Sequence, residues 1–140
     1  MSTLPKLDLD ISGPFWQAAA NQRLEIPRCI NCDMFVWYPK QQCPKCQDEL
    51  IWSEVSGKGT VAAFTVVRRP LLPDYGSWAP YVPALVALEE NPAIRIVSQL
   101  VDCDIENLTC DMAVEVVFRQ LEIPDQGSYW APLFKPSPPI

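Results

Sequence analysis

The sequence predicts a mainly β protein in which a short helix and a cysteine-rich module precede a small barrel. Three observations support this class. An alanine-rich stretch lies near the N-terminus, two C-x-x-C pairs follow it, and five β-rich runs occupy most of the remaining chain. Because no long helical pattern separates these runs, a small antiparallel barrel is favoured, and the OB-fold is the common five-stranded form. The predicted order is therefore an N-terminal helix, a rubredoxin-like zinc ribbon and a five-stranded OB-fold barrel.

The helix is predicted between Ser12 and Pro27, within an N-terminal segment of residues 1–27. Ser12 is a common helix cap, and Pro14 suits the first turn. The segment from Phe15 to Leu24 favours helix. Phe15 and Trp16 both lie near its start, and a short helix cannot bury both rings by itself. We therefore expect the helix to pack on another part of the molecule or on a partner.

Five β-rich runs are the predicted barrel strands, within residues 51–124. They alternate in polarity or are apolar throughout, and turn-forming residues bound them. They are Leu50–Val55, Lys58–Arg69, Val82–Glu89, Ile94–Val101 and Val114–Leu121. The chain contains 15 prolines, which keep its elements short. Residues 125–140 are rich in proline and aromatic residues, and they are predicted to form a C-terminal tail.

Two C-x-x-C pairs, separated by ten residues, predict a metal site in residues 28–50. The four ligands are Cys29, Cys32, Cys43 and Cys46. Two tight turns that face each other supply four thiolates for a tetrahedral ion. Zn(II) suits such a site, and iron in a rubredoxin-like site has the same ligands. Because the protein fills all four positions, the metal is expected to be structural rather than catalytic.

Composition excludes several classes of function. The chain has 140 residues and no histidine, so Ser-His-Asp and Cys-His triads and histidine-ligated metal sites are ruled out. The remaining cysteines, Cys103 and Cys110, have no imidazole to activate them, and we expect them to serve as small apolar side chains. The net charge of −6 argues against a general nucleic-acid-binding protein, which normally carries a basic face.

The N-terminus lacks the pattern of a signal peptide, and the apolar runs are too short to cross a bilayer. We therefore expect a cytoplasmic protein with no membrane association. Thiols stay reduced in that compartment, which favours metal binding over disulfides.

The sequence resembles a family of zinc-ribbon plus OB-fold proteins, first catalogued as a domain of unknown function and linked to acyl-CoA metabolism. The resemblance extends from about Pro14 to Pro136. It is carried by Phe15-Trp16, Arg28-Cys29-x-x-Cys32, Tyr38-Pro39, Cys43-Pro44-x-Cys46, Trp52-x-x-Val55-x-Gly57-x-Gly59-Thr60-Val61, Met112-Ala-Val114-Glu-Val116-x-Phe118 and Phe134-Lys135-Pro136. At one position the chain departs from the family pattern: Asp111 stands where the family tends to have glycine before the methionine.

The resemblance implies an accessory role. Family members are small subunits of thiolase-fold enzymes, namely thiolases, thiolase-like aldolases and acyltransferases. The partner carries the catalytic residues, and the small subunit stabilises it and in some members helps to bind or channel the CoA thioester. The ribbon and the N-terminal helices usually make the contact. Since thiolases are usually dimers, a hetero-oligomer of two plus two subunits is expected.

Candidate binding residues follow from this picture. Lys58, Arg68 and Arg69 are candidates for CoA binding, because guanidinium groups suit phosphates and Arg68-Arg69 is the only adjacent basic pair in the sequence. A solvated strand end is the alternative interpretation. The candidates for the partner interface are aromatic: Phe15, Trp16, Tyr75, Trp78 and Tyr81.

Three functions compete. The first is a non-catalytic subunit that binds a thiolase-fold enzyme and assists acyl-CoA binding or channelling. The second is a single-stranded nucleic-acid-binding protein, since OB-folds bind single strands elsewhere, although no basic groove is evident. The third is a rubredoxin-like electron carrier, which the ribbon spacing disfavours and which colour would reveal, because an oxidised iron site is red.

Overall fold

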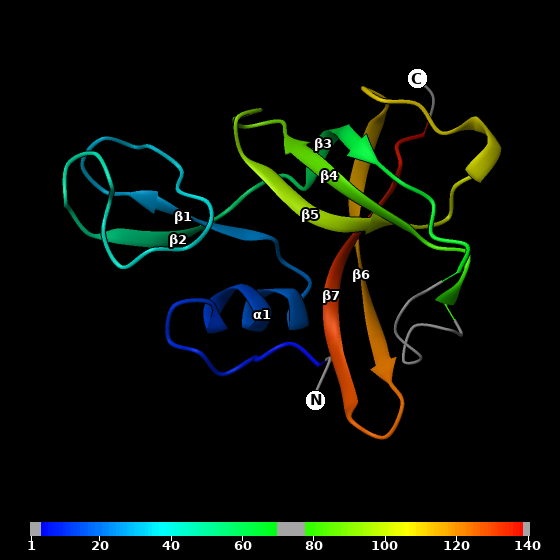
Figure 1. Ribbon diagram of the computed structural model, residues 1–140. Helices are drawn as coiled ribbons and strands as arrows, with labels where there is room; N and C mark the ends of the chain where they lie inside the picture. The colour runs from blue at the N-terminus through cyan, green and yellow to red at the C-terminus, as the bar shows by residue number, and fades with distance from the viewer. Residues whose placement is uncertain (1–3, 70–77, 139–140) are drawn as a thin grey trace.

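The computed structural model describes residues 4–69 and 78–138. A cysteine-rich ribbon lies on one side and a barrel on the other, and the helix α1 lies below the connection between them (Figure 1). The elements in chain order are α1 (Gly13–Ala20), β1 (Glu25–Cys29), β2 (Leu50–Glu54), β3 (Lys58–Phe64), β4 (Val82–Leu88), β5 (Arg95–Leu100), the 3-10 helix η2 (Ile105–Asn107), β6 (Ala113–Ile123) and β7 (Gly127–Pro136). The predicted fold class, mainly β with an N-terminal helix, a four-cysteine ribbon and a closed five-stranded barrel, is confirmed.

Helix α1 is shorter than predicted. It ends at Ala20, and Gln22 adopts a left-handed conformation with φ of 63°. Leu24 then leads directly into β1, so the predicted helix cannot continue to Pro27. Pro14 lies in the first turn as predicted, but Ser12, the cap residue, makes no side-chain hydrogen bond to the helix. The buried side of α1 packs against β7 and β1, which explains why Phe15 is only 8% exposed.

The strand at residues 50–54 belongs to the ribbon rather than to the barrel. It pairs antiparallel with β1 in a two-stranded sheet, from Glu25↔Glu54 to Cys29↔Leu50. The sequence analysis assigned it to the barrel and did not foresee β1, because Pro27 argues against a strand. Pro27 is tolerated because its missing N–H lies on the side of β1 that faces away from β2, where only its carbonyl is used, as the acceptor for the backbone N–H of Val36 at 2.9 Å.

The fifth barrel strand is β7, and the barrel order is β3-β4-β5-β7-β6. The prediction of a separate tail from residue 125 is therefore wrong for residues 127–136. Strands β6 and β7 form a long hairpin whose register runs from Ile123↔Gly127 to Val114↔Pro136. Phe134, which pairs with Val116, is fully buried, so β7 supplies part of the core.

A single parallel pair, Leu100↔Phe134, closes the barrel between β5 and β7. The two strands cross at a steep angle there and diverge away from the crossing (Figure 1). The backbone N–H of Val101 donates to the carbonyl of Phe134 at 2.9 Å. This thin closure leaves an opening on one side of the barrel.

Asp111 adopts a left-handed conformation, with φ of 69°, in a region that glycine favours. Its backbone N–H donates to the carbonyl of Val61 at 2.7 Å and so joins the turn to β3. Aspartate is among the non-glycine residues that tolerate this region, so the departure from the family pattern leaves the fold unchanged.

Within residues 4–69 and 78–138, no helix is long and apolar enough to cross a membrane.

Candidate metal centre and aromatic groove

The four cysteines predicted to bind metal converge at one end of the ribbon. Their sulfur atoms all lie within 4.8 Å of one another. The Sγ atoms of Cys29 and Cys46 are 3.4 Å apart, and those of Cys32 and Cys43 are 3.7 Å apart. A tetrahedral zinc ion with Zn–S bonds of about 2.3 Å requires sulfurs about 3.8 Å apart. The donor set therefore fits a tetrahedral metal of this size.

Two matching turns place these sulfurs. In the first, Asp33 donates its backbone N–H to the carbonyl of Cys29 at 3.1 Å, and in the second Gln47 donates to Cys43 at 2.9 Å. Asp33 and Gln47 both have left-handed φ values, 59° and 66°, so the chain reverses at the same point in each turn. The backbone N–H groups of Asn31 and Cys32 point at the sulfur of Cys29, at 3.4 and 3.5 Å. Such donors stabilise thiolates.

The thiols of this cluster do not ionise alike. The backbone N–H of Cys46 is the main cause that lowers the pKa of Cys43 to about 7. The N–H of Cys32 acts in the same direction on Cys29, but burial and the neighbouring thiols of Cys46 and Cys32 raise the pKa of Cys29 to about 11. Once one thiolate has formed, the next is harder to form beside it. The cluster therefore needs a cation before all four sulfurs can be ionised at neutral pH.

A second site lies on the barrel side, at the opening between β5 and β7. It is a groove of about 340 Å³. Its described lining residues are Phe15, Trp16, Trp78, Tyr81, Val97, Ser98, Gln99, Leu121, Tyr129, Ala131, Pro132 and Leu133. Four of the five residues predicted for a partner interface are thus brought together here. The fifth, Tyr75, lies outside the described residues.

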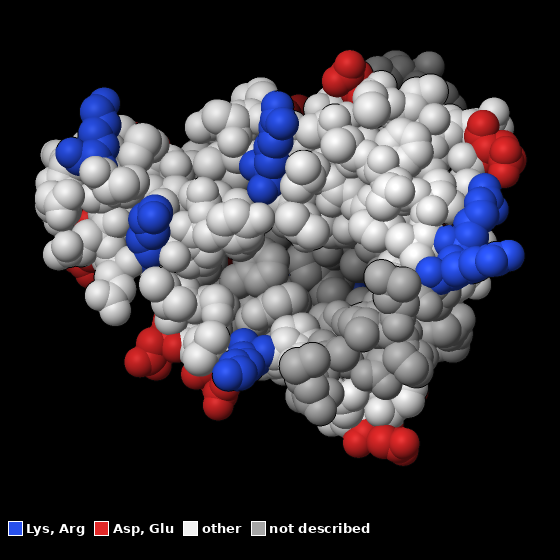
Figure 2. Space-filling view, viewed as in Figure 1, with Lys and Arg blue, Asp and Glu red and all other residues white. Residues whose placement is uncertain are grey.

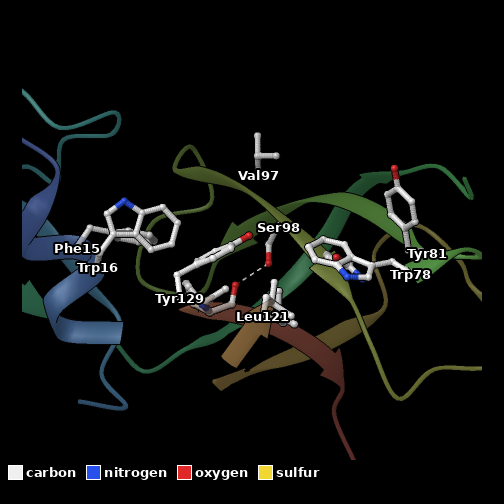
Figure 3. Close-up of a pocket in the computed structure, with 12 residues that line it drawn as sticks. Phe15, Trp16, Trp78, Tyr81, Val97, Ser98, Leu121 and Tyr129 are labelled. Carbon is white, nitrogen blue, oxygen red and sulfur yellow. Dashed lines mark hydrogen bonds between the residues drawn. The ribbon is translucent and has the colours of Figure 1, made fainter. Parts of the chain in front are cut away.

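Aromatic rings stand at both ends of the groove (Figure 3). At one end, Trp16 meets Phe15 edge-on with centroids 5.0 Å apart and meets Tyr129 edge-on at 5.7 Å. At the other end, the rings of Trp78 and Tyr81 are 6.3 Å apart. No described residue that lines the groove is charged. The face seen in Figure 2 is hollowed near its centre, and uncharged residues predominate around the hollow.

Sequence reasoning did not find Tyr129, Val97 or Ser98 as parts of this site. The aromatic content of residues 126–140 was noticed, but it was assigned to a tail. Val97 and Ser98 lie within a predicted strand, where nothing in the local pattern marks an opening beside them.

The three cationic residues predicted for CoA binding are not brought together. Lys58 opens β3 and lies near Glu89 and Glu115, whereas Arg68 follows the other end of that strand. Arg68 makes an exposed ion pair with Glu106 at 3.6 Å. Arg68 and Arg69 remain exposed neighbours in the chain, so they could share one phosphate without Lys58.

Cys103, one of the two remaining cysteines, does not have the setting of a nucleophile. Burial raises the pKa of the Cys103 thiol, and the nearby carboxylates of Asp102 and Asp104 add to the effect. Cys110 is exposed. A thiol with a raised pKa is a poor nucleophile at neutral pH.

Comparison with known proteins identifies this combination of modules. Residues 16–50 match the family model "ChsH2, rubredoxin-like zinc ribbon domain", and residues 52–119 match "ChsH2, C-terminal OB-fold domain". A "DUF35 domain-containing scaffold protein" of Methanocaldococcus jannaschii is 40% identical over 98 residues, which are 68% of this chain and 67% of that protein. The chain belongs to the DUF35 family. Its relative of the same description in Methanothermobacter thermautotrophicus is 34% identical over 67% of this chain and 70% of that protein.

Two further similarities are to proteins whose descriptions name an aldolase and a hydratase subunit. A solved structure described as "Ltp2-ChsH2(DUF35) aldolase" superposes with a TM-score of 0.76 at 29% identity, covering 94% of this chain and 98% of that one. A "Probable enoyl-CoA hydratase alpha subunit" of Thermomonospora curvata is 31% identical over 96% of this chain. The match covers 40% of that protein, so the chain corresponds to less than half of it.

Proposed function

We propose that this protein is a non-catalytic accessory subunit of a thiolase-fold enzyme: a thiolase, a thiolase-like aldolase or an acyltransferase. The main support is its similarity, over nearly the whole chain, to a chain of the structure described as "Ltp2-ChsH2(DUF35) aldolase". The absence of histidine and the closed four-cysteine cluster are consistent with a partner that carries the catalytic residues. In this role the protein stabilises the enzyme and assists acyl-CoA binding or channelling.

The aromatic groove supports a partner interface. It combines aromatic residues from both ends of the chain with an uncharged lining, a composition typical of the centre of protein interfaces. Phe15 is nearly buried within the protein itself, so Trp16, Trp78 and Tyr81 offer the larger contact surfaces.

Zinc is the metal proposed for the ribbon. The sulfur spacing fits Zn(II), and the matched family model describes a zinc ribbon. The residues that would hold it are Cys29, Cys32, Cys43 and Cys46. When bound, the metal would neutralise the charge of the thiolates and cross-link the two turns. Because the protein supplies four ligands, no coordination position is left for a substrate.

A tagged pull-down from the native host at physiological salt tests the accessory role. We expect a thiolase-fold protein to co-purify at near-equal stoichiometry and to be identified by mass spectrometry. The variant Trp16→Ala should recover much less of it than Gln17→Ala, which changes the neighbouring residue. Recovery of nucleic acid without a thiolase-fold protein would instead favour the single-strand-binding function.

A further inference from the structure

A continuous series of aromatic contacts joins the cysteine ribbon to the groove on the barrel. Trp37 lies in the stretch between the two C-x-x-C pairs, and its ring meets that of Phe15 on α1 with centroids 5.3 Å apart. Phe15 meets Trp16 edge-on at 5.0 Å, and Trp16 meets Tyr129 of β7 edge-on at 5.7 Å. All three separations lie in the range of stabilising aromatic pairs. Phe15, Trp16 and Tyr129 stand together at one end of the groove (Figure 3).

The stretch that carries Trp37 is fixed by the ribbon. It begins after Cys32 and ends before Cys43, two of the four proposed metal ligands. Near its middle, the backbone N–H of Val36 donates to the carbonyl of Pro27 on β1 at 2.9 Å. Strand β1 belongs to a sheet of two strands, which is too small to be stable alone. A bound metal would close this stretch into a loop and so restrict the positions open to Trp37.

The side chain of Trp37 is inserted against the helix. Its indole Nε1 is shielded from solvent, and its ring packs against the core cluster to which Phe15 belongs. The next residue, Tyr38, is 61% exposed, although its ring lies only 5.4 Å from that of Trp37. Of these two neighbouring rings, Trp37 is therefore the one that supports Phe15.

Helix α1 can transmit a change in the ribbon to the barrel. It packs against β1 of the ribbon and β7 of the barrel, and lies below the connection between the two modules (Figure 1). The helix has eight residues, and isolated helices of this length are unstable in water, so its position depends on what it packs against. Phe15 and Trp16 are adjacent on it. If Phe15 loses the support of Trp37, Trp16 can move away from Tyr129.

From these contacts we infer that metal occupancy of the ribbon controls the position of Trp16, and hence the shape of one end of the aromatic groove. Trp37 is the positioning residue: in the metal-bound ribbon it supports Phe15, and Phe15 holds Trp16 against Tyr129. Without the metal this end of the groove loses its order, while the barrel stays folded. The coupling itself needs no partner. Its consequence, that the metal-bound form binds the catalytic partner more tightly, rests on the proposed accessory function.

Nuclear magnetic resonance of the full chain with and without zinc tests the coupling. The indole N–H signals of the five tryptophans are recorded in nitrogen-15-labelled protein and assigned by substitution. We expect removal of zinc with a chelator to shift the Trp16 signal and to speed amide exchange in α1 at least about fivefold, because the helix loses part of its packing. Exchange in β6 should change by less than about twofold.

Two results would overturn the inference and leave the accessory function untouched. The first is a Trp16 signal and an α1 exchange rate that are the same with and without zinc. The second is a loss of protection in β6 as large as that in α1, because the metal would then hold the whole fold rather than one end of the groove.

Variants of Trp37 that still bind zinc separate the aromatic contacts from other effects of the metal. Metal analysis first measures their zinc content. Zinc-bound Trp37→Ala should place the Trp16 signal near its zinc-free position, whereas Trp37→Phe keeps a ring against Phe15 and should stay near the unmodified chain. Tyr38→Ala removes the exposed neighbouring ring and should leave the Trp16 signal unchanged. An unchanged signal in zinc-bound Trp37→Ala would overturn the role of Trp37. If this variant does not retain zinc, the comparison with and without zinc on the unmodified chain decides.

Recovery of the catalytic subunit tests the consequence for binding. Zinc-bound Trp37→Ala is used, because its ribbon keeps the metal. We expect it to recover about fivefold less of the catalytic subunit than Trp37→Phe does, since an ordered aromatic residue is lost from the contact surface. Equal recovery together with a shifted Trp16 signal would show that the groove is not the contact. If no catalytic subunit is recovered even with the unmodified chain, the accessory function fails, and the resonance data alone decide the coupling.

Discussion

Gly59 lies where β3 passes closest to β4. A Cβ atom added there would be 2.3 Å from the carbonyl oxygen of Ala87 and 3.0 Å from Cγ1 of Val86. The oxygen belongs to the backbone and cannot move without disturbing the β3–β4 ladder. The two glycines of the Gly-x-Gly motif are therefore required for different reasons. Gly59 leaves space for the backbone of β4, and Gly57 has a φ of +80°, which side chains other than glycine rarely adopt.

Gly59→Ala is expected to lower the free energy of unfolding by about 1–3 kcal/mol, because the new methyl group forces the two strands apart. Urea denaturation followed by circular dichroism measures this change. Thr60→Ala, an exposed change on the same strand, should stay within about 0.5 kcal/mol of the unmodified protein. Equal stability of Gly59→Ala and the unmodified protein would contradict this, because it would show that β3 and β4 accommodate the methyl group without moving apart.

At the scale of elements, we expect the ribbon to depend on a bound metal for its stability and the barrel not to. The ribbon sheet has two strands, too few for independent stability, whereas the barrel closes five strands around Phe134 and Val114. Leu24 and Ile26 of the ribbon side belong to the same core cluster. The backbone N–H of Val55 donates to the carbonyl of Leu24 at 2.9 Å, which extends the β1–β2 ladder by one residue pair.

Cys43→Ser is expected to abolish binding of the one zinc ion proposed per chain and to unfold the ribbon. Three thiolates no longer complete the tetrahedral coordination of the metal. Metal analysis measures the ion, and amide exchange should show loss of protection in β1 and β2 with protection retained in β6 and β7. Cys103→Ser, outside the cluster, should keep the zinc. A red protein containing iron would overturn the assignment of the metal.

The sheet that each predicted strand joins depends on which other strand it pairs with, and some of these partners are distant in the sequence. Val82–Glu89 and Ile94–Val101 were predicted almost as observed, since a turn joins them and their pairing is local. Strand β2 was predicted at the right residues but in the wrong sheet, because its partner β1 lies on the other side of the cysteine turns. Strand β7 was missed because its prolines weaken the local signal, although Pro132 is tolerated at the open seam.

At the scale of the whole molecule, charge limits where an anionic ligand can bind. The net charge of −6 repels CoA, and Arg68-Arg69 is the only adjacent basic pair in the sequence. Lys58 is the first residue of β3, at the opposite end of the strand, and Glu89 and Glu115 lie near it. If this subunit contacts the phosphates of CoA, we expect Arg68 and Arg69 to make the contact.

The double variant Arg68→Ala, Arg69→Ala is expected to weaken binding of a CoA thioester by the complex about fivefold to tenfold, since two charge-assisted contacts are lost. Lys58→Ala should leave the affinity unchanged. Isothermal titration calorimetry at low and physiological salt measures both, and the difference should shrink as salt rises. An unchanged affinity in the double variant would show that the catalytic partner alone binds the phosphates.

The sequence by itself determined the four-cysteine cluster, because each C-x-x-C turn is built from neighbouring residues and the repeated spacing can be recognised without knowing the fold. It also determined the fold class and the family. Only the tertiary structure decided that β7 closes the barrel, that β2 belongs to the ribbon, and that Trp16 and Tyr129 meet at one groove. These outcomes depend on contacts between residues up to 113 positions apart in the sequence, as for Trp16 and Tyr129, and the opening between β5 and β7 exists because the two strands diverge after a single shared pair.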